Sequence, residues 1–158
     1  MEEISITVFV DSDHGHDKAN RRPITGLIPF LGRTPAFYLS KQQGAIKAPT
    51  YGAKLCSMKT GVEETIAIRY TMRCLGVNVE TARLLCGDNM GVIQNSTIKS
   101  SLFKKKHVAI SYHKTCEAAA SGTVHPIKTD GTINYTDIII KSQDLKTFQL
   151  ITGSYFYG

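Results

Sequence analysis

The sequence lacks the segments that would direct it into or across a membrane. None of its 158 residues belong to an apolar run near the roughly 18 residues that span a bilayer. The acidic start MEEIS leads directly into a strand-like run, so we expect no signal or transit peptide. Repeats, low-complexity tracts and domain boundaries are also absent. We expect an intracellular protein, cytoplasmic or nuclear, with one domain over 1–158, a core at about 4–142 and a C-terminal tail at 143–158.

Cysteine pairing is absent as well. The four cysteines show no CxxC or CxxH spacing. We interpret them as small buried hydrophobic residues that stay reduced, and a zinc site or a disulfide framework is the alternative.

The apolar pattern predicts an α/β domain with a mixed sheet. Short β-branched and apolar runs predict strands, and longer runs with helical spacing predict helices. In chain order these are strands at 4–10, 24–31 and 36–40, a long helix at 50–77, a strand at 82–86, helices at 90–94 and 100–119, a strand at 123–127 and a helix at 135–141. Three sequential strands with short links favour an antiparallel meander.

The long predicted helix is central to this arrangement. Thr50 is a start signal and Gly76 a C-terminal stop. Apolar side chains near helical spacing should pack on the sheet: Leu55, Met58, Val62, Ile66, Met72 and Leu75.

Three aspartates stand at strand ends or helix starts. Asp11 follows the first strand, Asp88 the fourth, and Asp137 opens the last predicted helix. Such positions in open α/β sheets form ligand-binding crevices, and gathered carboxylates suit hard cations such as Mg²⁺. The alternative is that the three acids cap unrelated loops and helices. Spacing does not separate these two interpretations.

Short motifs follow one another in a characteristic order along most of the chain. They are VFVDSDHGHD, RRPITG, SKQQ, TYGAKL, GDN, KKKHVAISYH and TDIIIK. In this order they resemble the ribonuclease H domain of Ty1/copia-type retrotransposon Pol polyproteins, over roughly residues 6–142. That family shows an acid-rich run, then R-R-S-x-T-G, S-K-K/R-Q, S-T-x-x-A-E, x-D-N, K-H-x-x-I-x-Y-H and A-D-I-L-T-K.

The resemblance implies the ribonuclease H fold, a five-stranded mixed sheet of three antiparallel and then two parallel strands with helices on both faces. It implies cleavage of the RNA strand of an RNA–DNA hybrid with two Mg²⁺ or Mn²⁺ ions. It also implies a reverse transcriptase portion as partner, which this chain does not contain. By motif, Asp11, Asp88 and Asp137 match three of the family's four catalytic, metal-binding carboxylates.

The fourth carboxylate has no counterpart here. The glutamate of the A-E motif corresponds to Lys54, and a protonated lysine does not ligate Mg²⁺. Three carboxylates and one lysine carry two net negative charges, which balance one divalent ion or none. Glu63 and Glu64 lie about 14–15 Å further along the helix and cannot substitute, whereas Asp13 is near enough to supply one ligand. We expect hydrolysis to be absent or badly impaired, unless Lys54 reflects a sequence error or a recent mutation in an active element.

Pro29 also departs from the family pattern. Its strand is interior in the resembled fold, so a proline there should cost a ladder hydrogen bond. Two such departures indicate drift in an unselected copy, and the absence of polymerase, integrase and protease portions favours a relic. Three hypotheses remain: an impaired ribonuclease H, a catalytically dead nucleic-acid-binding module, and a non-functional transposon relic.

Basic residues supply candidate contacts to the hybrid. The net charge of +6 suits a polyanionic partner, although proteins without one also carry such an excess. These side chains either meet the hybrid backbone, independently of base sequence, or simply face solvent: Arg21, Arg22, Lys41, Lys47, Lys104, Lys105, Lys106 and His107. His14 and His16 form either a metal site with the nearby acids or polar loop contacts.

Overall fold

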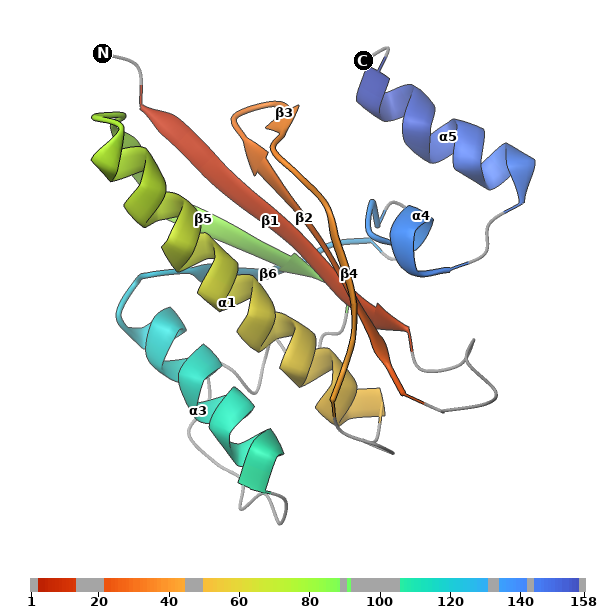
Figure 1. Cartoon of the computed structure of the whole chain (residues 1–158), viewed down its shortest axis with the longest axis horizontal. Coiled ribbons are helices and arrows are strands. Elements are labelled where there is room, and N and C mark those ends of the chain that lie inside the picture. The colour runs from red at the N-terminus through yellow and green to blue at the C-terminus, as the bar shows by residue number, and fades with distance from the viewer. Residues whose placement is uncertain are drawn as a thin grey trace.

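The computed structural model of the chain describes residues 3–13, 22–44, 50–88, 91, 106–130, 134–141 and 144–156. Figure 1 shows their helices and strands. In chain order these are β1 (Ile4–Asp13), β2 (Ile24–Leu31), β3 (Thr34–Pro35), β4 (Leu39–Gln42), α1 (Thr50–Cys74), β5 (Val79–Gly87), α3 (Lys106–Ala120), β6 (His125–Lys128), α4 (Asp137–Ile140) and α5 (Leu145–Phe156).

The strands form one mixed sheet. Its order is β3-β2-β1-β5-β6, and β4 pairs with β2 along the same edge as β3. β1 is antiparallel to β2 and parallel to β5, which is in turn parallel to β6. Helices α1 and α3 lie on one side of this sheet and α4 on the other (Figure 1). The predicted α/β class and strand directions are therefore confirmed.

Alternating side chains of β1 supply both faces of the sheet. The α1 side holds the main core, in which these side chains are at most 3% exposed: Ile6, Val8, Val10, Leu55, Met58 and Val62. On the other side, the Phe9 ring meets Tyr135 edge-on with centroids 4.9 Å apart, and Phe30 lies 5.5 Å from Phe9. Because both faces are covered, β1 is the central strand of the fold.

Helix α1 begins at Thr50 and stops near Gly76, as the sequence predicts. Gly76 adopts a φ of 74°, a left-handed conformation that glycine favours. The Val77 N–H donates to the Met72 carbonyl (2.9 Å) and the Gly76 N–H to the Arg73 carbonyl (3.0 Å). This pair of hydrogen bonds is a Schellman cap, which ends the helix.

Helix α1 approaches the sheet closely at Gly61. A Cβ atom there would lie 2.6 Å from Leu85 Cδ1 and 2.7 Å from Val10 Cγ1, so a larger side chain does not fit without movement. One turn later Thr65 is buried and donates its hydroxyl to the Gly61 carbonyl (2.7 Å), whereas Ile66 is 44% exposed. The prediction that Ile66 packs on the sheet is wrong, because Thr65 takes the inward position. The same prediction is wrong for Leu75, which is 71% exposed.

The outer edge of the sheet is interrupted beside Pro29. The Pro29 carbonyl accepts a hydrogen bond from the Ala36 N–H (2.8 Å), so its nitrogen faces the same outer strand but has no hydrogen to donate. Pairing accordingly stops between β3 and β4. The predicted strand at 36–40 is wrong in its bounds, since 36–38 is not a strand. On its other side, Pro29 pairs with Val8 of β1. Antiparallel strands alternate between hydrogen-bonded and non-hydrogen-bonded residue pairs, and this pair is of the second kind, so β1 needs no N–H from Pro29.

The remaining boundaries differ modestly from the predictions. β5 is longer than the predicted 82–86, and β6 is shifted two residues beyond the predicted 123 start. The helix predicted at 90–94 and the start of that at 100–119 fall largely outside the described residues. The interpretation of the cysteines as buried holds for Cys86 but is wrong for Cys74, which is exposed at the end of α1.

The predicted tail contains α5, so Asp137 opens the penultimate helix and not the last. The Asp144 carboxylate accepts a hydrogen bond from the Thr147 N–H (2.9 Å), which caps this helix. Along its length Ile151 is only 3% exposed, so α5 is partly packed. No helix among the described residues is long and apolar enough to cross a membrane.

Candidate functional site

The three predicted aspartates reach one end of the sheet from three different elements. Asp11 lies near the end of β1, Asp88 directly follows β5, and Asp137 begins α4. Because β1 and β5 are parallel, their C-terminal ends meet at the same edge. Helix α4 packs at this end against Gly26, the β2 partner of Asp11, where a Cβ atom would overlap Ile140.

Two lysines lie between these three carboxylates. Lys54 lies in the second turn of α1. Its Nζ is 2.6 Å from Asp88 Oδ1 and 3.4 Å from Asp11 Oδ1. Lys141 Nζ is 2.7 Å from Asp137 Oδ1 and 3.5 Å from Asp11 Oδ2. Negative and positive groups therefore alternate, with Asp11 in the middle. We call these five side chains the carboxylate–lysine cluster, and it carries one net negative charge.

Burial makes Asp11 depend on its neighbours. Its side chain is 2% exposed. Burial raises the pKa of Asp11, and the charge of Asp88 raises it further, while Lys54 and Lys141 act in the opposite direction. The two ammonium groups therefore favour the ionised form of a carboxyl that its surroundings otherwise disfavour.

The same arrangement stabilises the protonated form of Lys141. Burial lowers its pKa, but the hydrogen bond to Asp137 and the charges of Asp137 and Asp11 outweigh this effect, so the pKa of Lys141 is raised. Its ammonium group thus stays protonated throughout the neutral range.

As arranged, the cluster does not fit two divalent metal ions. Each carboxylate oxygen of Asp11 faces an ammonium group, and Lys54 stands where the family motif has a carboxylate. Mg²⁺ requires oxygen ligands at about 2.0–2.1 Å in near-octahedral geometry, which lysine cannot provide. Across the described part of the chain, no group of three His, Cys, Asp or Glu residues is arranged to hold a metal.

The sequence reasoning identified four of the five members of the cluster and missed Lys141. A local signal existed, since Lys141 follows Asp137 by four residues within α4 and its C-cap, a spacing that brings side chains together. Its contact with Asp11 depends on how α4 packs and could not be seen locally. Asp13 lies two residues beyond Asp11 on the same face of β1. Its role as a substitute ligand stays a prediction.

Most of the predicted basic contacts fall outside the described structure. Arg22 is half-buried and lies two residues before β2. Among the remaining candidates, the residues or their side chains are not described: Arg21, Lys47, Lys104, Lys105, Lys106 and His107, together with His14 and His16. Their roles in nucleic-acid or metal binding stay predictions.

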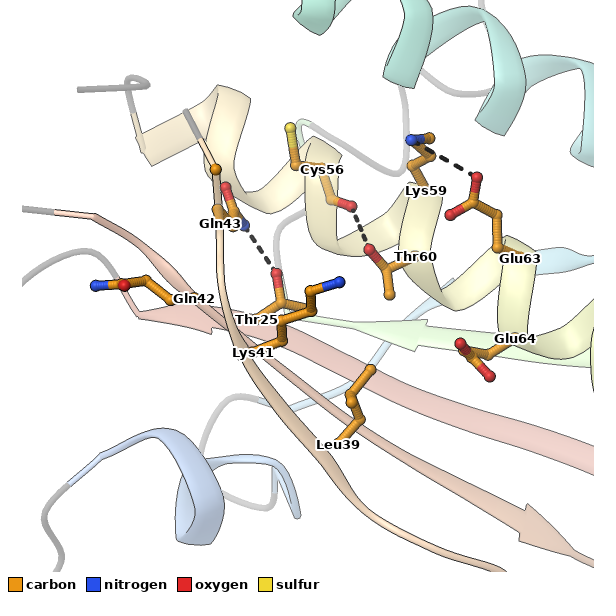
Figure 2. Close-up of a pocket in the computed structure, with 11 residues that line it drawn as sticks. Thr25, Leu39, Lys41, Gln42, Gln43, Cys56, Lys59, Thr60, Glu63 and Glu64 are labelled. Atoms are coloured by element: carbon orange, nitrogen blue, oxygen red, sulfur yellow. Dashed lines mark hydrogen bonds and ion pairs between the residues drawn. The ribbon is translucent and has the colours of Figure 1, made fainter. Parts of the chain in front are cut away.

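A polar groove separates β4 from α1 (Figure 2). Its volume is about 390 Å³. Lys41 and Gln43 come from the strand side, and Lys59 and Glu63 project from the helix (Figure 2). Its charge is mixed, but Glu63 is paired with both Lys59 (3.6 Å) and Lys114 (2.6 Å). Of the two lysines that line the groove, Lys59 is therefore paired with an acid, whereas Lys41 makes no ion pair with a described residue. Glu64 also lines the groove.

The Gln43 side chain, which lines the groove, is bonded to β2 and to the start of α1. Gln43 Nε2 donates to Thr25 Oγ1 and to the Ala53 carbonyl, both at 2.9 Å. Ala53 directly precedes Lys54, and Thr25 pairs with Ser12, the residue after Asp11. Gln43 therefore links the groove to the backbone beside Lys54, although none of the five cluster side chains lines the groove.

Solved structures define the class of fold. The chain is similar to the N-terminal RNase H domain of a Mycobacterium tuberculosis protein, with a TM-score of 0.63, 13% identity, and coverage of 96% of this chain and 99% of that one. It is also similar to RNase H1 of Halobacterium salinarum, with a TM-score of 0.58, 10% identity and coverage of 88% and 94%. LC11-RNase H1 in complex with an RNA/DNA hybrid gives a TM-score of 0.57 at 8% identity, with coverage of 84% and 88%. The chain has a ribonuclease H-like fold.

The sequence comparison adds a retrotransposon relative. The chain is 23% identical over 146 residues to the retrovirus-related Pol polyprotein from transposon RE1 of Arabidopsis thaliana. The match covers 92% of this chain and spans 10% of the relative's length. No protein-family model matches. The predicted resemblance to the ribonuclease H domain of a retrotransposon Pol polyprotein is confirmed by these findings together.

Proposed function

We propose that this chain is a retrotransposon-derived ribonuclease H-like domain that binds RNA–DNA hybrids and cleaves them poorly or not at all. One observation supports the proposal that cleavage is poor or absent. Lys54 Nζ lies within the set of carboxylates, 2.6 Å from Asp88 and 3.4 Å from Asp11. The family motif requires a carboxylate at this position, so the donor set needed for two-metal hydrolysis is incomplete.

Hybrid binding is supported by the fold and by the groove. A solved neighbour, LC11-RNase H1, is known in complex with an RNA/DNA hybrid. In the present chain, Lys41 and Lys59 line a polar groove between β4 and the first half of α1. Side chains of this kind contact phosphate and sugar groups independently of base sequence. We further propose that a reverse transcriptase is the natural partner, as the resemblance to retrotransposon Pol polyproteins implies.

Binding and cleavage are tested separately. Fluorescence anisotropy with a labelled hybrid, in EDTA and at several salt concentrations, should show affinity that falls as salt rises. Lys41→Ala should weaken binding and reduce the salt slope by about one unit. The matched variant Lys146→Ala, which changes an exposed lysine of α5, should leave both unchanged. Absence of salt-dependent binding by the natural chain would refute the binding role.

Cleavage is measured on the same hybrid with Mg²⁺ or Mn²⁺. We expect negligible product from the natural chain and increased product from Lys54→Glu, which restores the family's carboxylate. Robust cleavage by the natural chain would contradict the impairment. If neither hybrid binding nor restored cleavage is observed, the relic hypothesis is favoured.

A further inference from the structure

Within the carboxylate–lysine cluster, two lysines neutralise much of the charge of the three aspartates, which the sequence alone did not reveal. Lys54 and Lys141 approach different oxygens of Asp11, at 3.4 Å and 3.5 Å, and each makes a shorter contact with a second aspartate. Every carboxylate of the cluster thus has an ammonium neighbour. Repulsion among the three acids is relieved by the chain's own side chains.

We propose that Lys54 is a built-in counterion that replaces a divalent cation at this site and excludes such cations from it. The domain would therefore fold, and hold its three aspartates together, without Mg²⁺ or Mn²⁺. This inference rests on the ribonuclease H-like interpretation of the site given under the proposed function, but its test uses no nucleic acid.

Burial distinguishes the roles of the two lysines. The Lys54 side chain is 17% exposed and lies between Asp11 in β1 and Asp88 directly after β5. The Lys141 side chain is 33% exposed, nearer the surface. The A-D-I-L-T-K pattern of the family also ends in lysine, so a lysine at this position coexists with a complete carboxylate set. Lys54 is therefore the residue that changes how the site responds to cations.

Charge explains why a cation should be excluded. An ion placed between Asp11 and Asp88 would meet the ammonium group that already lies 2.6 Å from Asp88. It would have to displace that group from a largely buried position, or accept a like charge within contact distance. In Lys54→Glu the ammonium is lost and a carboxylate is gained, so the cluster changes from one to three net negative charges. That variant should require a cation to relieve repulsion.

Thermal unfolding in EDTA and in Mg²⁺ tests the inference. The melting temperature of the natural chain should be the same in both, and so should that of Lys146→Glu, which makes the same charge change at an exposed position of α5. Lys54→Glu should melt lower than the natural chain in EDTA. At a Mg²⁺ concentration about 100 times Kd, one ion bound only to the native state should raise its melting temperature by roughly 5–11 °C.

Mn²⁺ provides a direct measure of binding. The electron paramagnetic resonance signal of free Mn²⁺ should be unchanged by the natural chain and by Lys146→Glu, and should decrease with Lys54→Glu. If Lys54→Glu does not fold in EDTA, Lys54→Gln removes the ammonium without adding a fourth carboxylate, and it should also bind Mn²⁺.

Two results would overturn the inference. One is stoichiometric Mn²⁺ binding, or a Mg²⁺-dependent melting temperature, in the natural chain. The other is a folded Lys54→Glu or Lys54→Gln variant that ignores both ions, because Lys54 would then not be what excludes them. Loss of hybrid binding with the expected Mn²⁺ pattern would count against the proposed function alone.

Discussion

Replacing Lys54 by methionine should lower the free energy of unfolding by about 2–3 kcal/mol at neutral pH, because it removes one of two counterions from a buried carboxylate. Methionine retains most of the apolar stem and removes only the charge. The change isolates the electrostatic role of Lys54, which the Lys54→Glu variant mixes with the gain of a ligand.

The magnitude follows from burial. Breaking a buried ion pair costs about 3–5 kcal/mol, whereas an exposed pair contributes about 0.2–1 kcal/mol. Asp11 is 2% exposed and belongs to the first class, but Asp88 is 24% exposed and can be hydrated. Lys141 also remains 3.5 Å from Asp11. The destabilisation also has an upper limit, because Asp11 can take up a proton instead of remaining charged without Lys54. Protonating a carboxyl of ordinary pKa at pH 7 costs about 4 kcal/mol.

The pKa of Asp11 determines how the stability deficit of Lys54→Met should vary with pH. In the natural chain the pKa of Asp11 is already raised from its ordinary 3.8, chiefly by burial, and loss of Lys54 should raise it more. A carboxyl with a raised native pKa binds its proton more tightly in the folded state. It therefore destabilises the fold as the pH rises through that value. The deficit of Lys54→Met should be largest at neutral pH and should shrink as the pH falls toward 3.8.

Urea unfolding followed by circular dichroism measures the deficit at several pH values. The matched control is Lys146→Met, at an exposed position of α5, which should change stability by no more than about 0.5 kcal/mol. A melting temperature lower by roughly 4–12 °C should accompany the effect of Lys54→Met. A deficit no larger than the control's, or one independent of pH, would refute the reasoning.

Three further outcomes test other parts of the structure. Gly61→Ala should lower stability by about 1–3 kcal/mol, seen as a lower urea midpoint, because a Cβ there lies 2.6 Å from Leu85; a stabilised variant would contradict the tight approach. Burial raises the pKa of Glu63, but Lys114 and Lys59 outweigh it and the pKa is lowered, so Glu63 stabilises the fold above its ordinary 4.5. At 40% exposure, Glu63→Gln should cost about 0.5 kcal/mol at neutral pH, and the difference should vanish in acid. Burial raises the pKa of Cys86 to about 12, so a thiol reagent should modify exposed Cys74 first and Cys86 only upon unfolding, by mass spectrometry of timed samples.

Local patterns were sufficient wherever the determining contacts are local. The bounds of β2 and the start of α1 match the predictions, because apolar runs and start signals are properties of short segments. Gly76 ends α1 for the same reason, since only its own turn is involved. The meeting of Asp11 with Asp88 was also predictable, because parallel strands bring their C-terminal ends to one edge.

The remaining features depend on tertiary structure. The sequence predicted that Pro29 would cost a hydrogen bond, but not that the outer strand would divide. The register of β2 decides which neighbouring strand the Pro29 nitrogen faces, and the register is a tertiary feature. Helical spacing allows either Thr65 or Ile66 to face the sheet, and the packing at Gly61 selects Thr65. Lys141 reaches Asp11 only because α4 packs beside β1 and β2.

The interrupted edge at Pro29 also affects how copies of the chain meet one another. Long unpaired edge strands are templates for the addition of strands from other molecules, and proline, lysine and short length all oppose such addition. Here one edge consists of two short segments, with Pro35 in β3 and Lys41 in β4, and the opposite edge is four-residue β6, which contains Pro126 and Lys128. The proline that removes a hydrogen bond within the molecule therefore also deprives other molecules of a continuous strand to pair with, and so protects the fold against aggregation.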